Sequence, residues 1–442
     1  MIWITPAYVK DSPMADTVRE QLRRHADSDV VAIRYDDLAV TWRDYLAGAD
    51  ARAGAVTGML DDTRPRHVGT LLENTPEMLY ALAAGAFGGY VTVGLNATRR
   101  GEGLASDIRR SECQIILTDS RLGPLLDGLD LGDVRVIDTD SDEWAAIVAA
   151  SSAPQDPPPV GAMDPFMLIF TSGTSGDPKA VQVGNFTVTM SGENLAPSFG
   201  LTSDDVLYLS MPLFHSNAIM SGFSPAIAAG ATMALARRFS ATRFGDDVRR
   251  YGVTYMNYVG KPLAYILDTP ARPDDAQTTL RAAFGNEAAA KDIPAFAERF
   301  GCEVATSPAA LSAAGNRLSE PGRRSRDLVT QARLMAKGDT PSDPMVAQIL
   351  APFARANALV LAPGGGLASR YSADALMVCT VEALIARAFG LPVFIEGPSI
   401  GPIEVRRDHA ALAQLLNDSA RITVRDESSA DAARRIGRAI SP

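Results

Sequence analysis

The sequence has few cysteines and none of the spacings that mark a metal site or a disulfide framework. Cys113, Cys302 and Cys379 lie far apart and form no C-x-x-C pair. Neither a zinc site nor a set of disulfides is expected, and a reducing, cytoplasmic location fits this use of cysteine. Residues 1–13 also lack a basic segment followed by a long apolar core, so no secretory signal is expected.

Basic residues are fewer than acidic ones. The chain carries 42 Lys and Arg residues against 52 Asp and Glu residues, a formal net charge of −10. This balance argues against nucleic acid or an anionic membrane surface as a partner and favours a small molecule. Only five of the basic residues are lysines, which makes Lys179, at the end of a glycine-rich loop, a more specific signal.

Long uncharged runs are limited to residues 78–98 and 206–236, the second only if His215 is neutral. Both are interrupted by Gly, Pro, Ser or Asn, which a helix exposed to lipid would tolerate poorly. We expect buried core here and no transmembrane segment, with peripheral membrane contact left open.

The 442 residues exceed what one hydrophobic core usually serves, so two or more domains are expected. Helical and strand patterns alternate over residues 1–150, which predicts an α/β fold with a mostly parallel sheet. The helix expected from residue 41 to 60 has Trp42, Tyr45, Leu46 and Ala49 on one face.

A Pro-rich linker follows at 151–160, and the alternation then resumes. There, Ser240 and Gly252 are the expected N-cap and C-cap of one helix, and Gly301 is the expected end of another. The alternation stops at residues 305–326, a junction without apolar periodicity, and returns as a second doubly wound unit at 327–442.

The stretch "TSGTSGDPK" at 171–179 has the chemistry of a phosphate-binding loop. Glycines expose backbone N–H groups, hydroxyls add donors and a lysine adds charge. The residues concerned are Thr171, Ser172, Gly173, Thr174, Ser175, Gly176 and Lys179. The spacing G-x-x-G-x-x-K is not a Walker A loop, and the stretch joins two predicted strands instead of opening a helix. The alternative is a polar hairpin turn closed by Asp177 and Pro178.

Several motifs in a fixed order resemble the adenylate-forming superfamily, and fatty-acyl-CoA synthetases in particular. They are "FMLIFTSGTSGDPKAV" at the loop, "ENTPEMLYALAAGAFGGYVTVGLN" upstream, and "YLSMPLFHSNA", "YMNYVGKP" and "AAFGNEA" downstream. The resemblance covers about residues 15–304 and implies an adenylate-forming domain of layered sheets and helices, truncated and spanning residues 1–304.

The resemblance implies a role for each matching residue. The loop, with Lys179, would hold the β- and γ-phosphates of ATP, and His215 would sit beside the acyl carboxylate; these two residues are the catalytic candidates. Gly285, Asn286 and Glu287 would form the wall on which adenine stacks, and Tyr258, Val259 and Gly260 would line the acyl pocket. A hydrogen-bonded core histidine is the alternative for His215.

The implied reaction joins a carboxylate to ATP to give acyl-AMP, which CoA then converts to acyl-CoA. The family's aromatic-Gly-x-Thr-Glu motif, whose glutamate holds Mg²⁺, is replaced by "ATSPAALSAAG", and the C-terminal lid is absent. ATP, Mg²⁺ and CoA are thus the implied cofactors, with the metal-ligand motif missing and no metal ligand assigned. Turnover of a fatty-acid-CoA ligase type is expected to be impaired.

Residues 327–442 resemble the N-terminal, Rossmann-like half of polysaccharide pyruvyl transferases, which have a glycosyltransferase-B-type fold. The resemblance rests on "ALVLAPGGG", "ALIARAFGLPVFIEGPSIGPI" and "ARITVRDESSADAARRIG". Ligand candidates are the loop residues Gly364, Gly365, Gly366, Arg425 and Asp426 at predicted strand ends. An Arg425–Asp426 ion pair or a helix cap is the alternative for the last two.

Three functional hypotheses follow. The first is an acyl-CoA synthetase-like protein acting on ATP and a small-molecule carboxylate. The second is a pyruvyl transferase-like protein, and the third is a non-catalytic fusion of two partial domains. Sheet edges left by truncation could pair with another chain and form an oligomer.

Overall fold

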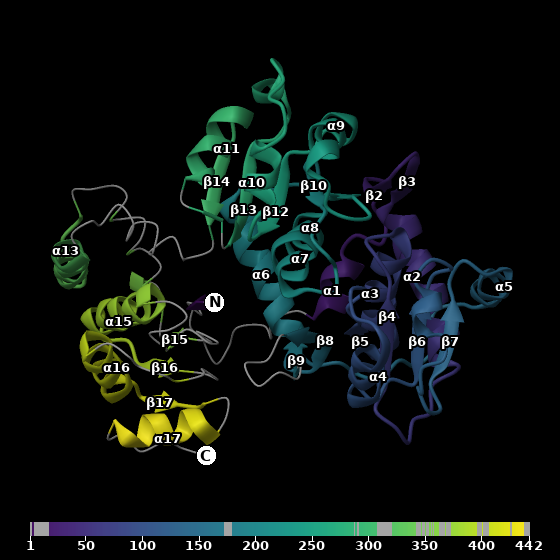
Figure 1. Ribbon diagram of the computed structural model, residues 1–442, viewed down its shortest axis with the longest axis horizontal. Helices are drawn as coiled ribbons and strands as arrows, with labels where there is room; N and C mark the ends of the chain where they lie inside the picture. The colour runs from purple at the N-terminus through teal and green to yellow at the C-terminus, as the bar shows by residue number, and fades with distance from the viewer. Residues whose placement is uncertain are drawn as a thin grey trace. The chain divides into compact units, whose positions relative to one another are not determined.

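The computed structural model confirms an α/β architecture (Figure 1). It describes residues 2–3, 17–171, 179–286, 288–289, 291–306, 321–341, 346, 350, 353–354, 356, 358–361, 367, 373–395, 400, 406–424 and 427–436. The chain forms two compact units, one of residues Met14–Ala305 and one that combines Met1–Pro13 with Thr306–Pro442. No helix in the described ranges is both long and apolar enough to cross a bilayer.

The first sheet of the larger unit holds the strands on both sides of the glycine-rich loop. Its order is β7 (Arg135–Asp138), β6 (Ile115–Thr118), β4 (His67–Leu71), β5 (Val91–Gly94), β8 (Pro165–Thr171) and β9 (Lys179–Gly184). All neighbours are parallel except β8 and β9, which form an antiparallel pair. The associated helices are α2 (Trp42–Thr57), α3 (Pro76–Gly88), α4 (Gly101–Arg110), η1 (Gly123–Leu126) and α5 (Asp142–Ala150).

The second sheet carries the remaining motifs. Its order is β14 (Glu303–Thr306), β13 (Ala282–Asn286), β12 (Tyr255–Val259), β10 (Val206–Leu209), β11 (Thr232–Leu235), β2 (Val31–Tyr35) and β3 (Leu38–Thr41). Between these strands lie α6 (Asn185–Ser198), α7 (Ser216–Ala218), the π-helical turn η2 (Ile219–Phe223), α8 (Ser224–Ala229), α9 (Ala241–Tyr251), α10 (Pro262–Leu267), η3 (Asp275–Gln277) and α11 (Asp292–Phe300). The pairs β12–β13, β10–β12, β10–β11 and β11–β2 are parallel, and the hairpin of β2 and β3 closes one edge.

Helix boundaries follow the signals in the sequence. Ser240 caps α9 by accepting a hydrogen bond from the Arg243 amide, and Gly252 ends it in the left-handed conformation. Gly301 ends α11 in the same way. These caps are confirmed, because a side-chain acceptor and a residue free to adopt positive φ are local requirements that the sequence displays directly.

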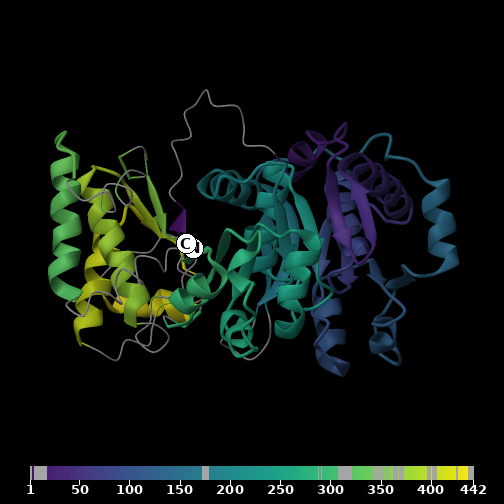
Figure 2. The same cartoon turned by 90° about the horizontal axis from the view of Figure 1, so that it is seen from above.

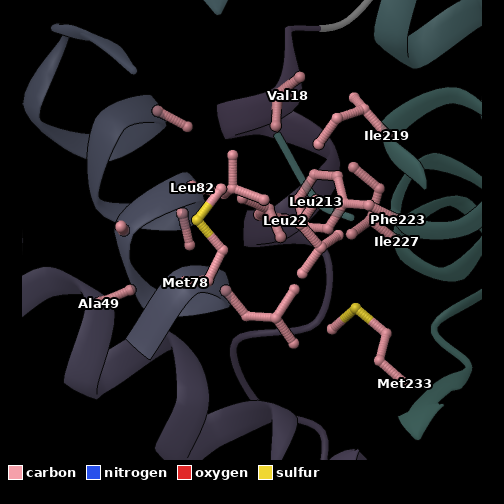
Figure 3. Close-up of a cluster of buried hydrophobic side chains, with 14 of the residues drawn as sticks. Val18, Leu22, Ala49, Met78, Leu82, Leu213, Ile219, Phe223, Ile227 and Met233 are labelled. Atoms are coloured by element: carbon pink, nitrogen blue, oxygen red, sulfur yellow. The ribbon is translucent and has the colours of Figure 1, made fainter. Parts of the chain in front are cut away.

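One hydrophobic core joins the helices of the two sheets. The predicted buried face of α2, formed by Trp42, Tyr45, Leu46 and Ala49, is fully or almost fully buried. Figure 3 shows α1 (Val18–Arg23) between α3 on one side and the segment from Leu213 to Ile227 on the other, with Val18 and Leu22 in the centre. The core therefore fixes the position of the segment that follows β10 relative to the first sheet.

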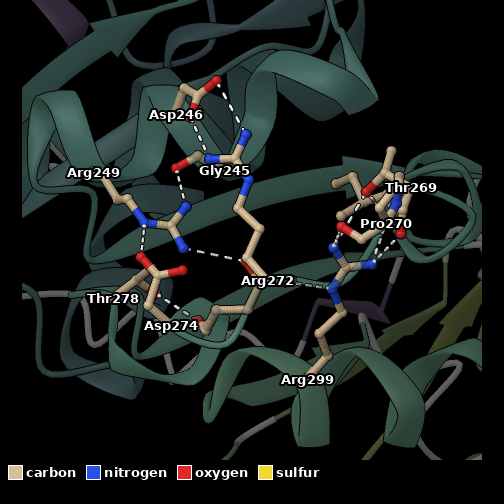
Figure 4. A network of polar contacts seen from close by, with 11 residues as sticks. Gly245, Asp246, Arg249, Thr269, Pro270, Arg272, Asp274, Thr278 and Arg299 are labelled. Atoms are coloured by element: carbon tan, nitrogen blue, oxygen red, sulfur yellow. Dashed lines mark hydrogen bonds and ion pairs between the residues drawn. The ribbon is translucent and has the colours of Figure 1, made fainter.

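An arginine–aspartate network secures the surface between α9, α10 and α11 (Figure 4). Asp275, whose side chain is 5% exposed, accepts from Arg299 Nε at 2.8 Å and from Arg249 Nη2 at 3.2 Å. Arg299 also donates to the carbonyls of Ile266, Thr269 and Pro270, just after α10. Arg249 also pairs with Asp274, and Arg272 pairs with Asp246, so three arginines face three aspartates. The network therefore stabilises the fold and presents no net charge to a ligand.

The smaller unit contains the second α/β pattern. Strands β15 (Leu359–Leu361), β16 (Val393–Ile395) and β17 (Arg421–Ile422) are parallel. Helix α15 (Ala373–Ala388) packs against α13 (Pro321–Met335) and α16 (Arg406–Asp418), as Figure 2 shows, and α17 (Glu427–Arg435) follows β17. Strand β1 (Ile2–Trp3) pairs antiparallel with β15, a contact that the sequence did not predict.

Candidate functional site

The order of strands in the second sheet reverses at β10, which makes the carboxyl edge at β10, β11 and β12 the expected place for a ligand crevice. Strand β10 lies between β11 and β12; the chain leaves β10 toward β11 and then returns to the other side of β10 to form β12. Crevices at such reversals of strand order are the usual ligand sites of α/β sheets. His215 follows β10, Gly260 follows β12 and Asn286 ends β13, so the predicted acyl and adenine residues meet at this edge.

Strands β8 and β9 flank the glycine-rich loop as an antiparallel pair. Thr171 and Lys179 are cross-strand partners and form the last described pair of β8 and β9. The prediction that the loop joins two strands is confirmed. Ser172, Gly173, Thr174, Ser175 and Gly176 lie outside the described residues, as do the side chains of Thr171 and Lys179, so their phosphate-binding role stays a prediction.

Asn74 holds the segment that carries His215. Its side chain is 2% exposed, donates to the carbonyls of Leu209 and Met211 at 3.2 and 2.9 Å, and accepts from the Leu213 amide at 3.0 Å. Because Asn74 follows β4 of the first sheet, its amide fastens the two sheets together at the site. The quoted stretch "ENTP" contains Asn74, but nothing in the sequence indicated this role.

The segment from Met211 to His215, called the histidine loop below, also packs against the first sheet at Gly94 of β5. A Cβ placed on Gly94 would lie 2.7 Å from Met167 Cε and 3.0 Å from the Cα of Phe214. Met167 lies on β8, and Phe214 stacks obliquely on His215 with ring centroids 4.6 Å apart. The close packing at Gly94 therefore sets the distance between the histidine loop and the strand that leads into the glycine-rich loop.

His215 is half-buried and precedes α7 as its N-cap residue. Burial lowers the pKa of its imidazole below the ordinary value of 6.5. The ring is therefore neutral at neutral pH, with one nitrogen able to donate a hydrogen bond and the other able to accept one.

The lowered pKa gives a prediction for stability against pH. Below about pH 6.5 the unfolded chain binds a proton at His215 more readily than the folded chain does, so the free energy of unfolding falls as the pH drops from about 7 to about 5. His25, whose pKa is also lowered by burial, contributes in the same direction. Urea denaturation across this range should show a shallower loss in His215→Asn than in the wild type. Identical pH slopes would contradict the assignment.

A set of hydrogen-bonded asparagine side chains links the segment that follows His215 to β12 and β13. Asn217 Nδ2 donates to the Tyr258 carbonyl at 3.0 Å and to Asn286 Oδ1 at 3.2 Å, and Asn217 Oδ1 accepts from Asn257 Nδ2 at 2.8 Å. Sequence reasoning missed Asn217 and Asn257. The signal was present in "HSNA" and "YMNYV", since polar amides in otherwise apolar segments need partners when buried.

The ends of β12 and β13 are held by a glycine that tolerates no side chain. A Cβ on Gly285 would lie 2.0 Å from the Tyr258 carbonyl oxygen and 2.6 Å from the tyrosine ring. The Tyr258 ring is fully buried and its hydroxyl donates to the Ala305 carbonyl. Gly260, at φ 71°, donates its amide to the Asn286 carbonyl. Val259 is half-buried at the end of β12, and Glu287 lies outside the described residues.

Charged residues reinforce the same edge. Glu73, 8% exposed, lies within 4 Å of Arg121, Arg237 and Arg238, of which the last two follow β11 of the other sheet. Arg237 also pairs with Asp119 at 3.8 Å, and the pKa of Asp119 is raised by its burial. No local pattern predicts this cluster, because most pairs of its members lie more than 40 residues apart along the chain.

Among the residues that the structure describes, no group of three or more His, Cys, Asp or Glu side chains is close enough to hold a metal ion. The residues from 307 to 319, where the resemblance places the family's Mg²⁺-binding glutamate, contain no acidic side chain in the sequence. These residues lie outside the described ranges, so the loss of the Mg²⁺ site stays a prediction.

Three described residues of the smaller unit, Leu367, Ile400 and Ser429, are linked by hydrogen bonds beyond the ends of β15 and β16. Leu367 and Ile400 form a parallel bridge after β15 and β16, and the Ile400 amide donates to Ser429 Oγ of α17 at 2.9 Å. The ligand candidates themselves, Gly364, Gly365, Gly366, Arg425 and Asp426, lie outside the described residues.

Comparison with known proteins agrees with the fold and the motif order. The family model "AMP-binding enzyme" matches residues 18–307, more than half of the chain. The chain belongs to the AMP-binding enzyme family. A second family model, "Polysaccharide pyruvyl transferase", matches residues 244–439 and overlaps the first over α9 to β14.

Two curated relatives have established names. A medium/long-chain-fatty-acid–CoA ligase, FadD17 of Mycobacterium tuberculosis, is 47% identical over 294 residues, which cover 66% of this chain and 58% of that protein. Steroid-22-oyl-CoA synthetase of Rhodococcus jostii is 40% identical over 309 residues, covering 69% of this chain and 56% of that protein. The chain thus spans less than two thirds of the length of these relatives.

Among solved structures, the N-terminal domain of FACL13 from Mycobacterium tuberculosis superposes with a TM-score of 0.58 at 19% identity. The match covers 66% of this chain and 76% of that one and shows a shared fold.

Proposed function

We propose that residues 17–306 bind ATP and a fatty carboxylate as an acyl-CoA synthetase-like domain. The observation that carries the proposal is the meeting of the histidine loop with the ends of β12 and β13, through Asn217, beside the hairpin of β8 and β9. The names of the two curated relatives support a carboxylate with a large apolar part as the substrate.

Each part of the site has a proposed task. Lys179 and the hydroxyls of the loop bind the phosphates of ATP, and Gly285 and Asn286 provide the surface for adenine. His215 lies next to the carboxylate, and Tyr258 to Gly260 lie beside the acyl chain. CoA is the proposed acceptor in the second half-reaction.

We further propose that turnover is slow. Mg²⁺ neutralises charge on phosphates during transfer of the nucleotidyl group, and removing such a charge costs several kcal/mol of barrier lowering. Residues 307–319 offer no acidic side chain to hold Mg²⁺. The domain would therefore still bind and orient ATP and the carboxylate, but would form the acyl-adenylate slowly. Carboxylate-dependent exchange of pyrophosphate into ATP tests this directly. Exchange at the rate of an ordinary acyl-CoA ligase would contradict impairment, and no ATP binding would overturn the assignment.

Lys179 provides the sharpest variant. A charge-assisted hydrogen bond to a phosphate contributes about 1.5–3 kcal/mol, so Lys179→Ala should weaken ATP binding by roughly 10- to 100-fold in calorimetry. Lys337→Ala, an exposed lysine of the smaller unit, is the matched control and should bind ATP as the wild type does. Equal affinities in all three proteins would place ATP elsewhere.

A pyruvyl transferase-like activity of residues 327–442 is the second candidate. It is favoured by the family model that matches residues 244–439 and by the hydrogen bonds that link Leu367, Ile400 and Ser429. Protection of this unit against thermal unfolding by phosphoenolpyruvate, lost in Arg425→Ala, would support it. No protection at millimolar ligand would count against it.

A further inference from the structure

We propose that Asn217 is a positioning residue that couples the acyl subsite to the nucleotide subsite, so that each ligand raises the affinity for the other. The inference rests on the proposed function. It concerns a residue to which the motif analysis assigned no role.

The geometry places Asn217 between the two subsites. It lies two residues after His215 on α7, and its Nδ2 group reaches both the Tyr258 carbonyl on β12 and Asn286 Oδ1 at the end of β13. Tyr258 belongs to the proposed acyl wall and Asn286 to the proposed adenine wall. One amide group therefore contacts both walls and the segment that carries the histidine.

The hydrogen-bonding capacity of Asn217 is well used. Both Nδ2 hydrogens have acceptors, and Oδ1 accepts from Asn257, which is 1% exposed. A half-buried amide with three partners on two strands has few alternative positions, because each alternative leaves a buried polar group unpaired at a cost of about 1–3 kcal/mol. A shift of either wall is therefore transmitted to the other.

The helix on which Asn217 sits is anchored on its far side. Two backbone carbonyls of the π-helical turn η2 accept hydrogen bonds from side chains. Ser191 Oγ donates to the Met220 carbonyl at 2.8 Å, and the Tyr255 hydroxyl donates to the Ser221 carbonyl at 3.0 Å. Gly222 packs closely against Asn257, since a Cβ there would lie 3.0 Å from Asn257 Oδ1. Helix α7 continues into this anchored turn and is therefore held in place. A movement of β12 would then shift β13 through Asn217, and the helix itself would not move.

Binding thermodynamics provides the test. Dodecanoate and the α,β-methylene analogue of ATP, which cannot form an adenylate, are titrated into the full chain separately and together. In the wild type each ligand should raise the affinity for the other by about fivefold or more, and reciprocity requires the same factor in both directions. In Asn217→Ala the factor should fall to about one, while each ligand alone still binds.

Asn217→Asp is the second variant. It keeps the oxygen that accepts from Asn257 and removes the donor to Tyr258 and Asn286, so it too should abolish the coupling. Asn194→Ala is the matched control and should keep the wild-type factor, because Asn194 is an exposed amide on α6 whose side chain donates to the Met190 carbonyl of its own helix.

The outcomes separate the two proposals. A wild type that binds each ligand alone, with a coupling that survives in Asn217→Asp, overturns the role of Asn217 and leaves the proposed function standing. A wild type that binds neither ligand overturns the proposed function, and this inference with it. Should Asn217→Ala fail to fold, Asn217→Asp decides the question.

Discussion

Gly285→Ala should destabilise the larger unit by about 3 kcal/mol or more, because the new methyl group would overlap a backbone atom that cannot move alone. The added Cβ would lie 2.0 Å from the Tyr258 carbonyl oxygen, in the second-to-last pair of the β12–β13 ladder. Separating the strands would also break the hydrogen bond from Asn217 to that carbonyl. Urea denaturation followed by circular dichroism measures the loss, and ATP binding should decrease with it.

Gly123→Ala is the control for this experiment. Gly123 lies in η1, and the nearest atom to a Cβ there is Thr118 Cγ2 at 3.6 Å, an ordinary contact distance. The free energy of unfolding of Gly123→Ala should remain within about 0.5 kcal/mol of the wild-type value. A Gly285→Ala protein as stable as Gly123→Ala would show that β12 and β13 do not approach each other as described.

Asp275→Ala should cost about 3 kcal/mol of unfolding free energy, since it leaves Arg249 and Arg299 without a buried partner. Burial acts to raise the pKa of Asp275, yet the pKa is lowered overall, because the Arg272 amide and the guanidinium groups of Arg299 and Arg249 stabilise the carboxylate. Its stabilising effect is therefore present above the unfolded pKa, near 4, and lost as the pH falls further.

Asp246→Ala is the matched control for the network. Asp246 pairs with Arg272, but both side chains are largely exposed, at 63% and 45%. An exposed ion pair contributes about 0–1 kcal/mol, so this variant should unfold close to the wild type. If both substitutions had equal effects, the burial of Asp275 would not be what makes its pair important.

The sequence predicted features that depend on local chemistry. The helix caps at Ser240 and Gly252, the buried face of α2 and the strand-to-strand setting of the glycine-rich loop each rest on a few neighbouring residues. The motif order also identified the strands whose ends meet at the crevice, and the match to the AMP-binding family confirms that resemblance.

The sequence did not predict features that depend on contacts across the fold. Asn74 fastens a loop more than 130 residues away, and Asn217 contacts residues of two strands that lie 41 and 69 residues further on. An asparagine in an apolar stretch indicates that a partner exists, but only the packed sheets show which backbone group it reaches. The pairing of β1 with β15 is of the same kind, since no local pattern connects residues 2–3 with residues 360–361.

The π-helical turn at Ile219–Phe223 has a consequence for the phase of the helical segment from 216 to 229. A turn that holds one extra residue rotates everything before it by about 100° relative to a regular α-helix. The second half of the segment directs Phe223 and Ile227 into the core, while the first half directs Asn217 toward β12 and β13. A regular helix would have to give up one of these two orientations. The extra residue thus lets one continuous segment pack a core and present a polar side chain to the crevice.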